Sequence, residues 1–194
     1  KDFKKIRLFS FLISIIAIVL VSNFENSAKN RIVNETISQM GLASEEKHVF
    51  SVVHESHYLS AYKMFLDNKI LGIGVRNFRN FCNNDKYKIN ERSCTTHPHN
   101  TYVQLLSETG LVGFIFGILV FIFFVLISSK HLIGVIFKNK YFFNDFEICM
   151  LSAILISLWP FVPTGNFLNN WVAIVYYFPA GFLLWSLNKR DILS

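Results

Sequence analysis

Four long apolar runs constrain the fold of this chain more than any other feature of its sequence. They cover residues 8–21, 111–127, 148–162 and 171–187, and none of the four contains a charged side chain. A helix crosses the apolar part of a bilayer with about 20 such residues, and flanking residues can extend shorter runs. We therefore predict an all-α integral membrane protein that folds as a multi-span helical bundle.

The basic residues at the ends of these runs predict how the chain crosses the membrane. They gather before the first run, in a loop predicted over residues 128–145, and after the last run. Short basic segments stay in the cytoplasm, so four spans would place the large loop on the opposite side. The predicted division is one span in residues 1–22, a loop region with amphipathic helices in residues 23–100, and three spans in residues 101–194. This placement also accounts for the net charge of +6 without a nucleic acid partner.

The start of the chain has two interpretations. A basic segment before an apolar run is typical of a signal peptide, but the small residues of a cleavage site are weakly represented here, so a retained helix is favoured. The sequence begins with Lys1 and enters the run almost at once. We therefore expect it to be a piece of a longer protein.

Residues 34–40 and 51–66 of the polar loop are predicted to be helices. The apolar residues that share one face of the second helix are Val52, Leu59, Tyr62 and Leu66, with Phe65 at the edge. An amphipathic helix of this kind lies either on the membrane surface or against the spans.

A glycine turn with two arginines follows the second helix. Gly72 and Gly74 allow a tight turn and the close approach of a ligand. Arg76 and Arg79 would share a face if this segment is helical. The third glycine of a dinucleotide-binding motif is missing, so that function is rejected.

Cys82 and Cys94 enclose a hydrophilic loop and are predicted to form a disulfide if their side of the membrane is oxidising. In the chain-entropy model, closing a loop of this size contributes about 3 kcal/mol. The bridge would restrain the segment that presents His97 and His99. The alternative is a pair of free thiols.

Two histidines stand where the polar loop meets the second apolar run. Pro98 suits the first turn of a helix, so Thr96 or His97 is predicted to be the N-cap, with His99 and Asn100 in the first turn. The positive partial charge of a helix N-terminus disfavours a protonated imidazole. A neutral imidazole at the membrane boundary could take a proton from a bound hydroxyl. The alternative is that these residues only begin and cap the helix.

These residues also carry a resemblance to a known family. The sequence His97-Pro98-His99-Asn100, then nine residues, then Gly110-Leu111-Val112-Gly113 is similar to the signature of the O-antigen ligase and O-antigen polymerase superfamily of bacterial inner membranes. Upstream, the segment from Tyr58 through Gly72-Ile73-Gly74 to Asn77-Phe78 resembles the helix, glycine turn and aromatic residue that precede that signature. The resemblance covers residues 51–123.

The resemblance implies a multi-span glycosyltransferase. Such a protein moves a glycan from undecaprenyl diphosphate to an acceptor hydroxyl on the periplasmic side of the inner membrane. The acceptor is lipid A core in the ligases and a second lipid-linked glycan in the polymerases, and membrane lipid surrounds both. The family histidine corresponds to His99, which would be the catalytic residue, without a metal or another cofactor.

The family often has an arginine near the start of the upstream helix, which is thought to hold the diphosphate. This chain has His54-Glu55-Ser56-His57 there, and Arg76 and Arg79 are the nearest replacements. Arginine suits this role because its charge is permanent and its planar group matches phosphate oxygens. The substrate-binding residues expected on this basis are Arg76, Arg79, His97, Asn100 and Glu108.

Two other functions are compatible with parts of the sequence. His54, His57, His97 and His99 could provide four ligands for a metal, although their spacing fits no familiar zinc pattern. The chain could also be a non-enzymatic transport or scaffold protein. Transporters tend to carry ionisable residues within their spans, which these runs lack. The sequence leaves open ligase or polymerase activity, and which sugar is moved.

Overall fold

The computed structural model describes residues 4–24, 30, 34–39 and 50–193, and the regular structure in these residues is helical, without strands. They belong to two compact units, Lys1–Glu55 and Ser56–Ser194. The first unit contains α1 (Lys4–Phe24), α3 (Glu35–Gln39) and the first residues of α4 (Val52–Asp67). α1 includes the apolar run of residues 8–21, and α3 corresponds to the helix expected over residues 34–40, of which Met40 lies outside the described residues.

The second unit contains the rest of α4, α5 (Phe78–Phe81), α6 (Thr101–Lys138), α7 (Asp145–Ser157) and α8 (Asn170–Leu193). Among the described residues, α6 and α8 are long and apolar enough to cross a membrane. The apolar stretch of α1 is shorter, and α7 has 13 residues. The all-helical class is confirmed for the described residues, and the division into four spans stays a prediction.

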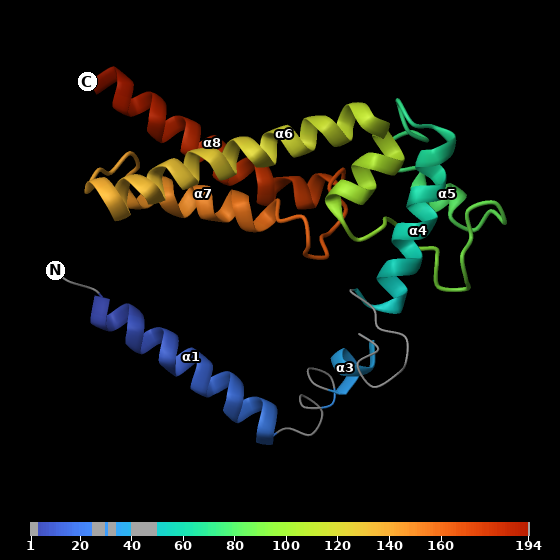
Figure 1. The fold of residues 1–194 in the computed structure, drawn as a ribbon, viewed down its shortest axis with the longest axis horizontal. Helices are drawn as coiled ribbons and strands as arrows, with labels where there is room; N and C mark the ends of the chain where they lie inside the picture. The colour runs from blue at the N-terminus through green and yellow to red at the C-terminus, as the bar shows by residue number, and fades with distance from the viewer. Residues whose placement is uncertain (1–3, 25–29, 31–33, 40–49, 194) are drawn as a thin grey trace. The chain divides into compact units, whose positions relative to one another are not determined.

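Helices α6, α7 and α8 run alongside one another in the second unit (Figure 1). Leu151 and Ile154 of α7 form a buried apolar cluster with Leu183 of α8. α7 begins with a capping box, in which Asn144 and Glu147 each accept a backbone N–H of the other. This exchange satisfies donors that have no partner within the helix.

α6 continues beyond the end predicted for its apolar run. A loop was expected from residue 128, which is wrong, because the helix extends to Lys138. The carbonyl of Gly134 accepts the N–H groups of Asn139 and Lys140, and Asn139 has a φ of 45°. A left-handed residue at this place is a common way to end a helix, and asparagine tolerates it.

α6 is broken at Gly110, where φ is 65° and ψ is −159°. The chain changes direction there, so residues 101–109 fold back along the start of the following helical segment (Figure 1). The ring of Tyr102 lies 6.2 Å from that of Phe121. A side chain at Gly117 would meet Leu105, so this glycine makes room for the returning segment.

The glycine turn predicted from the sequence fills the break. The N–H groups of Ile73 and Gly74 donate to the carbonyls of Ser107 and Glu108, both at 3.0 Å. On the other side of the break, Leu111 N–H donates to the carbonyl of Lys69 at 2.8 Å. Helix ends leave such groups without partners in the helix itself. The turn therefore supplies the hydrogen bonds that the broken helix has lost.

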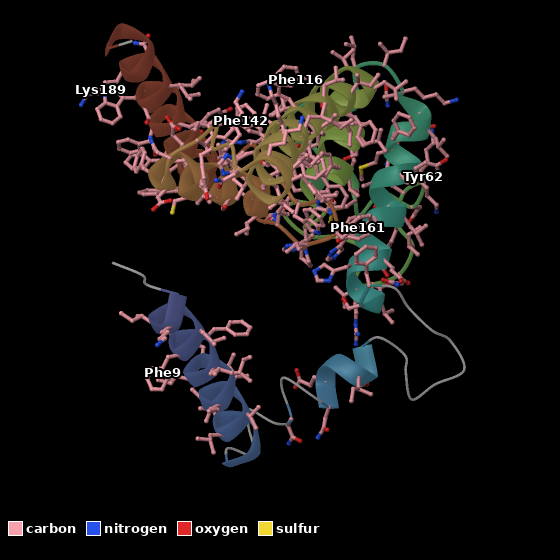
Figure 2. All side chains as sticks on the ribbon, turned by 60° about the vertical axis from the view of Figure 1, so that its left-hand side comes forward. Phe9, Tyr62, Phe116, Phe142, Phe161 and Lys189 are labelled. Atoms are coloured by element: carbon pink, nitrogen blue, oxygen red, sulfur yellow. A yellow bond between two sulfur atoms is a disulfide. The ribbon has the colours of Figure 1, made fainter. Side chains whose placement is uncertain are left out.

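α4 packs through a different face from the apolar one. The residues predicted to share the apolar face, Val52, Leu59, Tyr62 and Leu66, are exposed, and Tyr62 projects outward (Figure 2). The buried face consists of Ser56, His57, Ser60, Ala61 and Met64. Its small side chains allow close packing of the helix. A histidine is thus brought into the interior of the second unit.

Candidate functional site

Three segments of the second unit meet around the predicted histidines. They are the turn of residues 69–79, the loop of residues 96–100 and the loop of residues 158–169. Thr164 joins two of them, because its N–H donates to the carbonyl of His99 at 2.9 Å. Arg76 joins the third, because its guanidinium donates to the carbonyl of Leu168 at 2.9 and 3.2 Å.

The N-cap of α6 is Asn100, so the predicted capping by Thr96 or His97 is wrong. The Asn100 side chain accepts N–H bonds from Tyr102 and Val103, and its own amide N–H donates to the carbonyl of Pro160 at 2.7 Å. Asparagine is one of the best capping residues, and this one is also fixed by the neighbouring loop. The buried Asn100 therefore positions the site, and the histidines precede the helix instead of lying in its first turn.

His97 is held by both of its ring nitrogens. Nε2 lies 3.3 Å from the carbonyl of Thr164, and Nδ1 lies 2.9 Å from the Thr96 hydroxyl. Burial lowers the pKa of His97, its bond to Thr164 raises it, and the nearby His57 and Arg79 lower it further. A neutral ring then carries its proton on Nε2, because a carbonyl can only accept. His97 is consequently engaged in joining two loops.

The lowered pKa of His97 predicts a dependence of loop closure on pH. The opened state takes up a proton below a pH of about 6.5, before the closed state does, so the closed state loses stability as the pH falls below that value. We expect faster amide hydrogen exchange in residues 96–100 and 160–168 at pH 5.5 than at pH 7.5, after correction for intrinsic rates. The variant His97→Gln should lose this difference. Equal corrected exchange at both pH values would contradict the assignment.

His99 is the least buried of three neighbouring imidazoles. Its ring centroid lies 4.2 Å from that of His97 and 5.4 Å from that of His57. Its φ is 59°, a left-handed conformation that turns the chain immediately before the cap. His97 and His57 are buried, whereas His99 is partly open. His99 is thus the ring of the three that a substrate can reach.

The four-histidine metal site does not assemble in the described residues. They contain no group of three or more His, Cys, Asp or Glu side chains placed to hold a metal ion. His54 instead bonds locally, with Nδ1 2.8 Å from the Ser51 hydroxyl.

Glu108 is buried and supports the glycine turn. Its two carboxylate oxygens accept the backbone N–H groups of Arg76 and Phe78, at 3.0 and 3.1 Å. The side-chain amide of Gln104 donates to it at 3.0 Å. A buried carboxylate needs such donors. This position favours support of the turn over direct contact with a substrate.

Arg76 and Arg79 are exposed on the turn and on α5. Arg76 has a φ of 62°, and its guanidinium is oriented by the Leu168 carbonyl. The charge of Arg79 acts on His97. Within the described residues, no ion pair joins either guanidinium to a carboxylate. Both charges are therefore available to an anionic ligand near the histidines.

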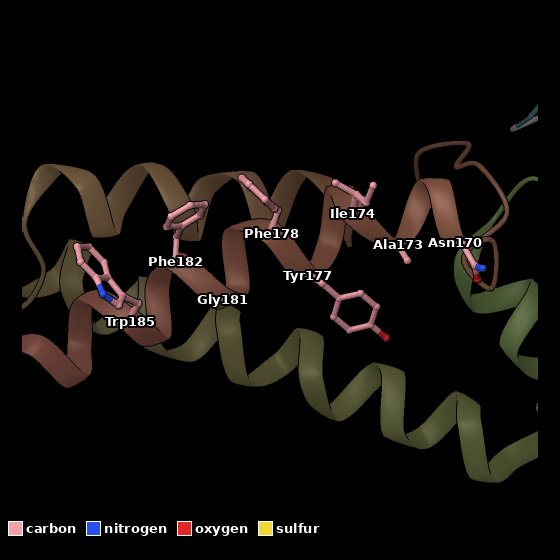
Figure 3. A pocket seen from close by; sticks show the side chains of 8 residues that line it. All are labelled: Asn170, Ala173, Ile174, Tyr177, Phe178, Gly181, Phe182 and Trp185. Carbon is pink, nitrogen blue, oxygen red and sulfur yellow. The ribbon is translucent and has the colours of Figure 1, made fainter.

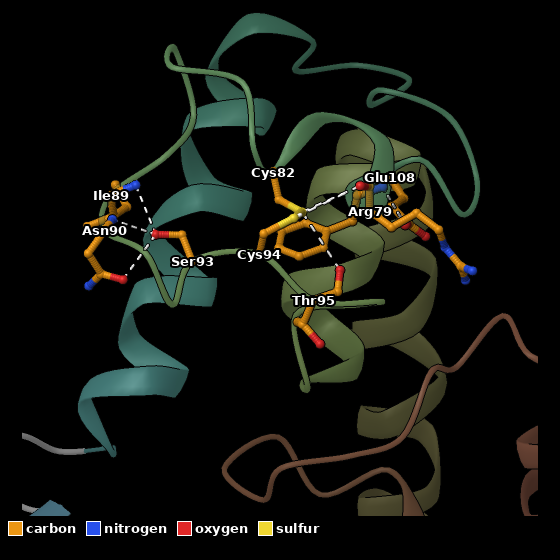
Figure 4. Close-up of a disulfide and its surroundings, with 9 residues drawn as sticks. Arg79, Cys82, Ile89, Asn90, Ser93, Cys94, Thr95 and Glu108 are labelled. Atoms are coloured by element: carbon orange, nitrogen blue, oxygen red, sulfur yellow. Dashed lines mark hydrogen bonds between the residues drawn. A yellow bond between two sulfur atoms is a disulfide. The ribbon is translucent and has the colours of Figure 1, made fainter.

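Cys82 and Cys94 form a disulfide in the structure, with their Cα atoms 4.9 Å apart (Figure 4). Cys82 is also part of a buried cluster with Ala61, Met64 and Phe78. The bridge ties the end of α5 to the segment that leads to His97. It thereby connects the arginine-bearing part of the site to the histidine-bearing part.

Gln104 and Asn166 support the site, a role that was not predicted for either residue. The amide of Gln104 donates to Asn166 Oδ1 at 2.8 Å and accepts the N–H of Phe167 at 3.0 Å. Gln104 lies four residues before Glu108, so both share a helix face. Two polar residues four positions apart, next to an apolar run, are the sequence pattern from which this supporting role could have been predicted.

Two apolar hollows lie next to these loops. The smaller, of about 150 Å³, lies between the returning segment, the rest of α6 and α8, and its lining includes Thr101, Leu105, Phe167 and Tyr177. The larger, of about 550 Å³, is an open groove along α8 that Tyr177 also lines (Figure 3). Such surfaces suit hydrocarbon chains.

A comparison with protein families finds one match, to the family described as O-Antigen ligase, over residues 1–118. The matched stretch is more than half of the 194-residue chain. It contains every residue predicted for the site and excludes α7 and α8. No curated protein and no solved structure matches the chain.

Proposed function

The chain belongs to the O-antigen ligase family of polysaccharide-building membrane enzymes, and from this premise we propose that it moves a glycan from undecaprenyl diphosphate to an acceptor hydroxyl. The acceptor is lipid A core or a second lipid-linked glycan. The observation that carries the proposal is that the loop of residues 158–169 bonds both to the partly open His99 and to the exposed guanidinium of Arg76, while the charge of Arg79 acts on the neighbouring His97. These residues lie where the loops meet a helix long enough to span a membrane.

His99 is the proposed base. The acceptor oxygen attacks the anomeric carbon of the donor, the bond from that carbon to the diphosphate breaks, and the hydroxyl proton passes to the imidazole. Of the neighbouring rings, His97 is engaged through both nitrogens. His99 is the partly open one. A base must come within hydrogen-bonding distance of the proton that it removes, which favours the accessible ring.

Arg76 and Arg79 are proposed to hold the diphosphate. Negative charge grows on the leaving phosphate oxygens, and fixed positive charge lowers the energy of that state. The Leu168 carbonyl accepts from the Nε and one terminal nitrogen of Arg76, which leaves the other terminal nitrogen free to face a ligand. Arg79 is exposed and influences the histidine loop electrostatically.

Removal of the Arg79 charge should weaken donor binding more than the chemical step. We expect Arg79→Gln to raise the KM for the donor about tenfold, which corresponds to about 1.4 kcal/mol, and Arg79→Lys to recover part of the loss. The matched control is Arg92→Gln, since Arg92 is an exposed arginine in the disulfide-closed loop. An unchanged KM in Arg79→Gln would contradict a phosphate-binding role.

The site is proposed to face the periplasm of a bacterial inner membrane, with the lysine-rich end of α6 in the cytoplasm. Lys130, Lys138 and Lys140 lie at that end, whereas Tyr102, three residues after His99, packs beside Phe121, nearer the break at Gly110. Short basic segments favour the cytoplasmic side. The disulfide is compatible with an oxidising compartment on the side of the site.

A reconstituted transfer reaction tests the function. The full-length protein in liposomes receives labelled glycan on undecaprenyl diphosphate, together with lipid A core or a second lipid-linked glycan. We expect released undecaprenyl diphosphate in amounts equal to the transferred glycan, with or without a chelator. A single addition to lipid A core identifies a ligase, and a ladder of repeats identifies a polymerase. Movement of the glycan across the bilayer without release would contradict the proposal and support a transport protein.

A further inference from the structure

His57 is a buried histidine to which the predicted site assigns no role. It lies on the buried face of α4, together with Ser60, Ala61 and Met64. In the sequence it is one of four possible metal ligands, and the described residues contain no assembled ligand set. Its ring instead lies 5.4 Å from the ring of His99, with the two planes inclined by 32°.

Two imidazoles, those of His97 and His57, lie beside the ring of His99. His97 is joined through both nitrogens to Thr96 and Thr164. A ring held in this way keeps one proton and has no open nitrogen to accept a second. His57 is brought to His99 from a separate helix, and both rings belong to the second unit. Among the described imidazoles, His57 is therefore the group beside His99 that can share a proton with it.

We propose that His57 is a positioning residue that receives from His99 the proton taken from the acceptor hydroxyl, so that the two imidazoles act as one base. This inference rests on the proposed function. The O–H bond of the acceptor breaks as an N–H bond forms on His99, His57 shares that proton with His99, and the proton leaves to solvent from His99, the partly open ring. The diphosphate leaves with the electron pair of the broken carbon–oxygen bond.

The charges around the pair oppose the build-up of two protons. His97 and His99 come from the loop before α6, and the charge of Arg79 from α5 acts on His97 beside the pair. His54 and Glu55 lie on α4 itself. Because the two ring centroids are only 5.4 Å apart, a proton on one ring disfavours a proton on the other. Coupled groups of this kind titrate as a pair.

The pH dependence of transfer tests the proposal. The full-length protein requires both rings to be neutral, so the logarithm of its transfer rate should rise with a slope approaching 2 at low pH. We expect His57→Phe, which keeps an aromatic ring, to lower the rate about tenfold and to reduce the slope to 1. Added imidazole should restore part of the rate in His57→Ala. His54→Gln is the matched control and should keep both the rate and the slope.

The outcomes separate this proposal from the one on which it rests. A loss of transfer in His99→Asn together with an unchanged slope in His57→Phe overturns the role of His57 and leaves His99 as the base. Full transfer in His99→Asn overturns both the base and the role of His57, whereas movement of the glycan across the bilayer without release of undecaprenyl diphosphate overturns the proposed function itself. Rates are compared per amount of folded protein, and His57→Gln is measured in parallel. A lower rate with an unchanged slope in both His57→Phe and His57→Gln assigns the residue to packing alone and overturns the proposal.

Discussion

His99→Asn is expected to lower glycan transfer by about 10²- to 10⁴-fold, the usual contribution of a positioned base. Asparagine is the informative substitution because His99 has a φ of 59°, in the left-handed region that asparagine adopts more readily than most residues. The variant removes the imidazole and keeps the backbone that leads into the cap. His99→Ala would combine the loss of the base with backbone strain.

The measurement is the initial rate in liposomes at saturating donor, with donor binding measured separately. Binding of undecaprenyl diphosphate should stay within about threefold of the original protein, since the proposed phosphate contacts come from Arg76 and Arg79 and a base acts in the chemical step. A matched control is His131→Asn, because His131 lies far along α6 and its Nδ1 accepts the N–H groups of Phe142 and Phe143. Normal transfer by His99→Asn would show that another group removes the proton.

The sequence was informative about helices and about neighbours in the chain. The runs of residues 111–127 and 171–187 lie within α6 and α8, and the cysteines that enclose a polar loop are bonded. Apolar composition and length determine such elements locally, so they can be recognised without the fold. The continuation of α6 to Lys138 was missed because its end depends on hydrogen bonds from Asn139 and Lys140 to Gly134.

The arrangement of the site depended on contacts that the sequence does not display. Asn100 became the cap in place of Thr96 or His97, because its amide also reaches the carbonyl of Pro160 at 2.7 Å. His57 reached His99 because α4 packs through its small and polar face instead of its apolar face. Both outcomes are decided by tertiary packing, which overrides local preference.

Gly110→Ala is expected to disrupt the site without touching a substrate. At a φ of 65° and a ψ of −159° the backbone lies in a region that is essentially restricted to glycine, and the strain alone costs about 1–3 kcal/mol. A Cβ atom would also collide with the carbonyl of Ile70 and the nitrogen of Gly72. These are backbone atoms of the turn that fills the break, so they cannot move aside as a flexible side chain could.

The effect on function follows from the hydrogen bonds at the break. If α6 straightens, the carbonyls of Ser107 and Glu108 lose the N–H groups of Ile73 and Gly74. The turn that carries Arg76 then separates from the segment that carries the histidines. We expect transfer to fall at least 100-fold, a loss of about 2.7 kcal/mol or more in transition-state stabilisation, and the thermal midpoint in detergent to fall by several degrees.

Gly181→Ala is the matched control, since a Cβ at Gly181 in α8 would meet nothing within 4 Å. It should preserve transfer and, because alanine is the better helix former, leave the thermal midpoint equal or slightly higher. Cysteines introduced at positions 70 and 111 would report the break directly. We expect them to form a disulfide efficiently when residue 110 is glycine and poorly when it is alanine. Normal transfer and an unchanged midpoint in Gly110→Ala would mean that the left-handed break at this glycine is not needed to assemble the site.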